Sequence, residues 1–126
     1  MAYYLDTSAA VKLVVAERGS TALMRWLEAQ TADIVGSDLL RTELLRAVRR
    51  TAPEQMERAR AVLDAVVLLT LPTSVFERAA DLDPEVLRSL DALHLAAAVQ
   101  LGDELDGIIT FDERLAEAAR RRGIAV

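Results

Sequence analysis

The stretch AYYLDTSAAVKLVVA at residues 2–16 contains the unit on which the rest of the chain is built. Residues 2–5 form an apolar, tyrosine-containing run that predicts a β-strand, and residues 8–16 carry the apolar spacing of a helix. The acid Asp6 stands at the junction between the two. A short strand that leads at once into a helix is typical of parallel α/β proteins, so this stretch predicts that class.

The same alternation of strands and helices continues along the chain without an internal repeat or a linker. Further strands are predicted at residues 34–36, 66–71 and 107–111, and residues 124–126 can add a short final strand. Helices are predicted at residues 21–30 behind a Ser20 cap, 38–50, from Pro53 onward, 73–82 and 113–122. We expect an α/β fold, a three-layer α/β/α sandwich with a short, mostly parallel central sheet of four to five strands and helices on both faces.

The segment between residues 83 and 102 allows two interpretations. Asp83-Pro84-Glu85 has the composition of a helix start, with a cap, a proline and a first-turn acid. One long helix can run from there, or Ser89 can cap a new helix that places Asp91 in its first turn, and Gly102 ends both versions. We favour the new helix.

Length and composition favour a single domain spanning residues 1–126, because 52% hydrophobic content supplies one core and the length leaves no room for a second. With no cysteine there is neither a disulfide framework nor a thiolate zinc site. The amino-terminal residues lack a signal-peptide pattern, and the apolar stretches fall far short of the roughly 20 residues that cross a bilayer. We therefore expect a soluble, cytoplasmic protein without a membrane partner.

Four acids occupy the junctions of this frame. They are Asp6, Glu43, Asp91 and Asp112. Ligands of open parallel sheets bind beyond the carboxyl ends of the strands, so acids delivered there from separate segments can converge on one cleft. Two carboxylates about 4 Å apart repel by roughly 4 kcal/mol at an effective dielectric near 20, and Mg²⁺ or Mn²⁺ is the natural compensation because both prefer oxygen ligands. Since the chain has only one histidine, we expect a metal-bound water, not a histidine base, to supply the nucleophile for phosphoryl chemistry.

Each acid also has a structural interpretation. Asp6 and Asp112 can cap helices and Asp91 can lie at a positive helix end, effects worth about 0.5 to 2 kcal/mol each. Glu43 has no capping role, because the pattern places it inside a helix among leucines. The joint placement of the four acids favours a site.

The motifs around the acids resemble those of PIN-domain ribonucleases, and more closely those of VapC toxins from bacterial VapBC toxin–antitoxin systems. They are YLDTSA with Asp6, TELLRA with Glu43, LRSLDALHLAAA with Asp91 and GIITFDERLAEAA with Asp112, in family order over the whole chain. The resemblance implies a PIN-like fold and an endoribonuclease whose four acids line a Mg²⁺ or Mn²⁺ pocket and which cuts RNA phosphodiesters with metal-activated water. It also implies a homodimer and inhibition by a cognate VapB antitoxin that places a basic side chain in the acidic pocket.

Two hydroxyls lie beside the acids: Ser8 follows Asp6 by two positions, and Thr110 precedes Asp112 by two. A hydroxyl can orient a metal-bound water or a phosphate. An N-cap role for Ser8 and ordinary β propensity for Thr110 explain the same residues, and the sequence leaves both interpretations open.

The single histidine, His94, lies one turn after Asp91 and shares its helix face. We expect it to be packed and hydrogen-bonded rather than a metal ligand, since hard-cation sites seldom recruit imidazole. Four arginines lie on or near the helix of Glu43: Arg41, Arg46, Arg49 and Arg50. They can hold RNA phosphates or form a solvated face, whereas stabilisation of a helix end suffices to explain Arg120–Arg122.

The net charge of −5 argues at first sight against a nucleic-acid partner, but four of the acids can be neutralised by metal. All but one of the 15 basic residues are arginine, which suits phosphate contacts, although a general codon preference for arginine explains the same ratio. Two rival functions remain. A phospho-acceptor receiver domain has similar length and an acidic Mg²⁺ pocket. Such domains carry two paired acids after the first strand, whereas this chain has Asp6 followed by Thr7. A catalytically inactive PIN-like binding module, whose acids only cap helices, is the other.

Overall fold

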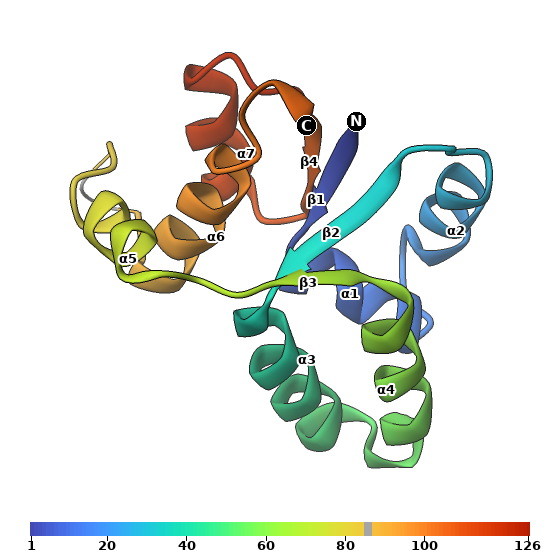
Figure 1. The fold of residues 1–126 in the computed structure, drawn as a ribbon. Coiled ribbons are helices and arrows are strands. Elements are labelled where there is room, and N and C mark those ends of the chain that lie inside the picture. Colours follow the sequence, from blue (N-terminus) through green and yellow to red (C-terminus); the bar gives the residue numbers. More distant parts are fainter. Residues whose placement is uncertain (85–86) are drawn as a thin grey trace.

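The computed structural model describes residues 1–84 and 87–126, which form one parallel sheet with helices on both sides (Figure 1). The strands are β1 (Ala2–Leu5), β2 (Asp33–Ser37), β3 (Val67–Leu69) and β4 (Leu105–Ile109), in the sheet order β3-β2-β1-β4. The α-helices are α1 (Thr7–Val14), α2 (Ser20–Glu28), α3 (Asp38–Thr51), α4 (Met56–Ala65), α5 (Thr73–Ala80), α6 (Ser89–Val99) and α7 (Glu113–Arg121). Two short 3₁₀ helices lie at Pro53–Gln55 and Gly102–Glu104.

Two separate hydrophobic clusters flank the sheet. Because successive strand residues point to opposite faces, Tyr4 joins the cluster of α5, α6 and α7, while Leu5 joins the cluster of α1 to α4. Both side chains are fully buried. Figure 1 shows α3 and α4 below the sheet on one side and α5 and α6 grouped on the other. The predicted three-layer α/β/α architecture is confirmed, with four strands, all of them parallel.

Strand β1 has neighbours on both sides. It pairs with β2 through Tyr3 and Tyr4 and with β4 through Leu5 and Ile109, among other pairs. The strand order therefore runs from β1 outward to β3 on one side and turns to β4 on the other. This is the switch in strand order beyond which parallel sheets bind ligands, and Asp6 follows β1 at that point.

The strands of the carboxyl-terminal part have other bounds than the sequence predicts. Strand β4 begins and ends two residues earlier than predicted, because the backbone amide of Phe111 bonds to the hydroxyl of Ser8 instead of to a neighbouring strand. The predicted final strand is wrong: residues 124–126 make one sheet-like bond, from the amide of Ile108 to the carbonyl of Ala125 at 2.9 Å, and form no strand.

Two predicted helix caps are also wrong. Gly19, not Ser20, occupies the N-cap of α2, with a φ of +91° that side-chain-bearing residues rarely adopt. Helix α6 is a separate helix with Asp91 in its first turn, as favoured, but its cap position is Arg88, which makes no side-chain cap bond, and Ser89 is already helical. Glu85 lies outside the described residues. In the part of the chain that the structure describes, no helix is long and apolar enough to cross a membrane.

Candidate functional site

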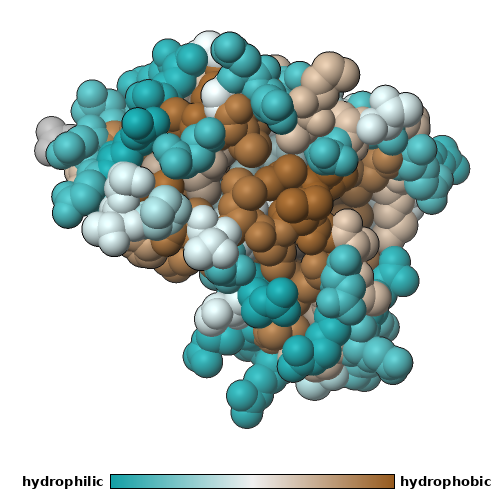
Figure 2. Space-filling view, viewed as in Figure 1, coloured by the Kyte–Doolittle hydropathy of each residue, from teal (hydrophilic) through white to brown (hydrophobic). Residues whose placement is uncertain are grey.

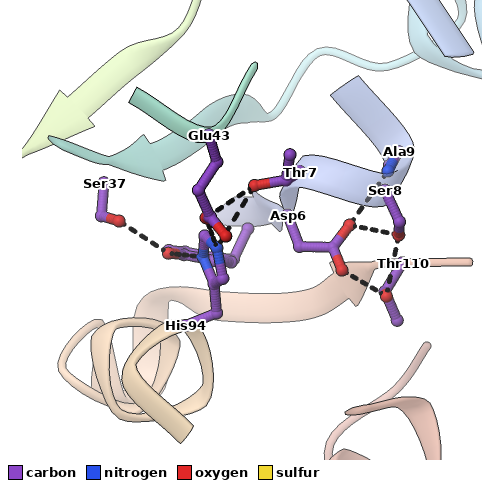
Figure 3. A network of polar contacts seen from close by, with 9 residues as sticks. Asp6, Thr7, Ser8, Ala9, Ser37, Glu43, His94 and Thr110 are labelled. Atoms are coloured by element: carbon purple, nitrogen blue, oxygen red, sulfur yellow. Dashed lines mark hydrogen bonds and ion pairs between the residues drawn. The ribbon is translucent and has the colours of Figure 1, made fainter. Parts of the chain in front are cut away.

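Asp6 is held from both sides at the end of β1. It is the N-cap of α1, where Oδ1 accepts from the backbone amide of Ala9 at 3.0 Å and from the hydroxyl of Ser8 at 2.7 Å. Oδ2 accepts from the hydroxyl of Thr110 at 2.5 Å (Figure 3). With 3% of its surface exposed, the carboxylate is fixed by three donors from two separate segments.

The two hydroxyls tie the end of β1 to the loop after β4. Ser8 Oγ accepts from the amide of Phe111 at 2.8 Å, and Thr110 Oγ1 accepts from the amide of Asp112 at 3.0 Å. The hydroxyl oxygens of Ser8 and Thr110 lie 3.3 Å apart. Ser8 is therefore not a helix cap, since Asp6 takes that role, and both hydroxyls orient the carboxylate between them.

Glu43 comes from the second turn of α3 and meets α1 and α6. Its Oε1 accepts from the hydroxyl of Thr7 at 2.8 Å and lies 2.5 Å from Nε2 of His94 (Figure 3). Nδ1 of His94 lies 2.8 Å from the hydroxyl of Tyr4, which donates to Ser37 Oγ at 3.1 Å. The histidine is 2% exposed, so the structure places it packed and hydrogen-bonded, as expected.

Asp91 and Asp112 face a common cleft. Asp91 lies in the first turn of α6, and Asp112 is the N-cap of α7, accepting from the amides of Arg114 at 2.9 Å and Leu115 at 3.0 Å. An open cleft of about 400 Å³ is lined by both acids together with Arg88, Phe111, Glu113 and Arg114. The capping interpretation of Asp112 is thus correct, and it coexists with a place in the cleft.

The four acids act on one another electrostatically. Burial raises the pKa of Asp91, and the charges of Asp112, Asp6 and Glu43 raise it further, against the opposing charge of His94. Burial also raises the pKa of Asp6, outweighing the hydrogen bonds from Thr110, Ala9 and Ser8. Since the charges of the other three carboxylates all act on Asp91, the four acids lie close enough to influence one another.

Glu43 differs from the other acids because the protein already compensates its charge. Burial alone would raise the pKa of Glu43, but the hydrogen bond and charge of His94 and the hydroxyl of Thr7 outweigh it, so the pKa lies below its usual value. At neutral pH this side chain is an ionised acceptor.

The donor set suits a hard cation held by few protein ligands. Carboxylate oxygens are the ligands that Mg²⁺ and Mn²⁺ prefer. Within residues 1–84 and 87–126, no three carboxylate or imidazole side chains are arranged to hold one ion together. Mg²⁺ usually takes one or two carboxylates and keeps several waters, so the paired acids Asp91 and Asp112 beside the fixed Asp6 fit such an ion, whereas a closed cage is absent from the described residues.

The metal-free protein should lose stability as pH rises from 3.8, the ordinary pKa of aspartate, through the raised pKa values of Asp6 and Asp91. Below pH 3.8 the two aspartates are protonated in both the folded and the unfolded state. Above pH 3.8 the unfolded chain releases these protons first, so the free energy of unfolding falls until the pH has passed the folded-state pKa values. Glu43, with a lowered pKa, acts in the opposite sense near its ordinary 4.5.

Thermal unfolding in EDTA over a pH series, for the wild type and an Asp6→Asn/Asp91→Asn double variant, measures this effect. The variant should gain stability relative to the wild type as pH rises. A stability difference that does not change with pH would contradict the raised pKa values.

A larger groove of about 730 Å³ opens on the other side of Glu43. It is lined by residues of α3, of the segments after β3 and of the start of α1, including Thr7, Glu43, Arg46, Arg50, Phe76 and Leu90. Arg46 and Arg50 lie one helical turn apart on this groove, whereas Arg41 and Arg49 are exposed elsewhere on α3. Figure 2 shows hydrophobic residues gathered on the face where β3 lies, above α3. The groove therefore combines two guanidinium groups with apolar walls.

Sequence reasoning missed the buried part of the site. It did not single out Tyr4 or Ser37, which lie on β1 and at the end of β2 and carry the hydrogen bonds behind His94. The only sequence signal was a tyrosine on the buried face of a strand, because a buried tyrosine hydroxyl usually needs a partner.

Comparisons with known proteins agree with the fold. The PIN domain family matches residues 3–121. Ribonuclease VapC47 of Mycobacterium tuberculosis is 45% identical over 124 residues, which cover 95% of this chain and 91% of that protein. Ribonuclease VapC46 of the same species is 41% identical over 125 residues, covering 99% and 95%.

A solved structure has the same fold. The crystal structure of Mycobacterium tuberculosis VapC20, described as a Sarcin-Ricin loop cleaving toxin, superposes with a TM-score of 0.76 over 92% of this chain and 94% of that one. The sequence identity is 17%, so this likeness concerns the fold alone.

Proposed function

The chain belongs to the PIN-domain family and, within it, to the VapC ribonuclease toxins, and on this premise we propose that it is a Mg²⁺- or Mn²⁺-dependent endoribonuclease silenced by a cognate VapB antitoxin. The observation that carries the proposal is that Asp91 and Asp112 line one cleft and that the charge of Asp6, which follows β1 at the switch in strand order, acts on Asp91. Because the chain belongs to a family of ribonucleases, nothing supports the alternative that it is a receiver domain.

The roles of the chain's own residues follow from their contacts. Asp91 and Asp112 are proposed to hold the cation directly, and Asp6 and Glu43 to hold it through its water molecules. Mg²⁺ or Mn²⁺ bound there would offset the phosphate charge and would lower the pKa of a water molecule, which makes that water a better nucleophile. Ser8 and Thr110 keep Asp6 in one orientation through their hydrogen bonds, so that little reorganisation is needed when substrate arrives.

The groove beside Glu43 supports RNA as the substrate class. Arg46 and Arg50 line it and suit phosphate oxygens, since a guanidinium pairs with them bidentately. Phosphate contacts position a nucleic acid without reading its bases. Glu43, one of the four acids, is itself part of the lining of this groove, so a strand that lies there contacts the acidic site at Glu43.

Metal removal tests the activity directly. Purified, antitoxin-free protein is incubated with total RNA and Mg²⁺ or Mn²⁺, with and without EDTA, and new RNA ends are mapped by sequencing. We expect discrete cuts that disappear in EDTA and return when metal is restored in excess. Cuts that persist in EDTA would contradict the metal dependence. Intact RNA in every condition would instead support the inactive binding module.

The partners are proposed from the family, and the surface supports the antitoxin. An acidic cleft suits the basic side chain of an inhibitory VapB segment, because complementary charge favours association. A homodimer is proposed from the family alone. Light scattering on the purified protein should give twice the monomer mass of 13.8 kDa, and a monomer mass at all concentrations would contradict the dimer.

A further inference from the structure

His94 is the only histidine of the chain, and both of its ring nitrogens are engaged. Nε2 lies 2.5 Å from Oε1 of Glu43 (Figure 3). Nδ1 lies 2.8 Å from the hydroxyl of Tyr4. Tyr4 and Ser37, the next group in line, have no exposed surface. The imidazole is therefore fixed at one end by the sheet and contacts the acidic site at the other.

The direction of the contact with Glu43 follows from its chemistry. An ionised carboxylate only accepts hydrogen bonds, so Nε2 of His94 carries a hydrogen and donates it to Oε1. Thr7 donates to the same oxygen at 2.8 Å. Two donors on one oxygen fix both the position and the rotation of the carboxyl group.

The second oxygen of Glu43 has a different environment. Among the residues that the structure describes, both hydrogen bonds to this carboxylate end on Oε1, while the Glu43 side chain lines the groove. Oε2 is thus the oxygen of Glu43 that can accept a hydrogen bond from groups in the groove. Glu43 differs in this from Asp6, whose two oxygens are both bonded to the protein.

We propose that His94 is a positioning residue for RNA cleavage: through Nε2 it holds Oε1 of Glu43, so that Oε2 is presented to the water and phosphate of the substrate. This rests on the proposed ribonuclease function. Tyr4 and Ser37 fix the ring from behind, as outer groups fix the ligands of many metal sites. Glu43 then acts by orientation at the substrate and is not required as a ligand of the cation.

The single histidine makes the contact directly observable. Long-range ¹H–¹⁵N spectra of the metal-free protein at constant pH contain one imidazole, whose two nitrogen resonances report the proton on each. We expect a protonated Nε2 whose resonance moves in Glu43→Gln, and an Nδ1 resonance that moves in Tyr4→Phe. Asp112→Asn, which changes a site charge without touching the ring, should leave both in place. Resonances unmoved in Glu43→Gln would overturn the proposed contact.

Two isosteric substitutions separate positioning from packing. Glutamine at position 94 can place an amide N–H where Nε2 lies, whereas asparagine reaches only the position of Nδ1. We expect His94→Gln to keep kcat within about fivefold of the wild type and His94→Asn to lower it by about 10- to 100-fold, with KM unchanged in both. The melting temperatures of the two variants report any common loss of packing.

Equal kcat values for His94→Gln and His94→Asn at equal stability would overturn the positioning role, as would a change confined to KM. If the wild type itself cuts no RNA, the proposed function fails. The imidazole spectra of the metal-free protein still decide whether His94 holds Glu43, so the two failures are distinguishable.

Discussion

Asp6→Asn should abolish RNA cleavage and leave the fold intact. Asparagine caps a helix as well as aspartate does, and its oxygen can accept from Ala9 and Ser8 as Asp6 Oδ1 does. The lost element is the negative charge at the switch in strand order. Because metal-assisted charge stabilisation contributes several kcal/mol, we expect the rate to fall by about a thousandfold or more.

Three measurements check this prediction together: single-turnover cleavage of the mapped RNA, circular dichroism, and thermal unfolding in EDTA. The melting temperature of Asp6→Asn should equal or exceed that of the wild type, since the variant removes one of four mutually repelling charges. Cleavage at the wild-type rate by contaminant-free variant protein would overturn the assignment of Asp6. A collapsed spectrum would mean that the charge itself is needed for folding.

Asp112 offers the second large effect, because its two roles can be separated. Asp112→Asn keeps the cap on α7, whose acceptor bonds to Arg114 and Leu115 need only a side-chain oxygen, while Asp112→Ala loses it. We expect both variants to lose cleavage by about a hundredfold or more, since each removes one of the charges that face the cation. Only Asp112→Ala should also lose about 1 kcal/mol of stability.

Cleavage rates and denaturant unfolding of the two variants give the comparison. Activity that falls only in Asp112→Ala, in proportion to its lost stability, would mean that Asp112 serves as a cap and nothing more. Activity lost equally in both, with stability lost in one, separates the chemical role from the structural one.

The sequence predicted local structure well where one signal dominated. Residues 2–5 alternate between the two faces and end at a capping acid, and β1 has these bounds. The end of β4 was misplaced because Thr110 and Phe111 have high β propensity, yet their polar groups bond to Asp6 and Ser8. These side-chain acceptors end β4 before Thr110, and β propensity does not predict such bonds.

The candidate site was predicted as a set of residues, but not as a set of contacts. The assignment of the four acids to catalysis and metal binding stays a prediction, and the structure adds the hydrogen bonds and the positions of their side chains. The pairing of Glu43 with His94 joins residues 51 positions apart, and it depends on how α3 and α6 are placed about the end of the sheet. Spacing along one helix gave His94 the neighbour Asp91, whereas its closest partners, Glu43 and Tyr4, come from other elements.

The position of β1 has a consequence for biosynthesis. Its partner β4 is translated about a hundred residues later, so at about 5–20 residues per second a nascent chain waits several seconds before β1 can pair on that side. Thr110, which holds Asp6, and Asp112 emerge later still. The ribosome therefore extends a chain whose acidic cleft is incomplete, and the enzyme assembles only when its last segments have left the exit tunnel.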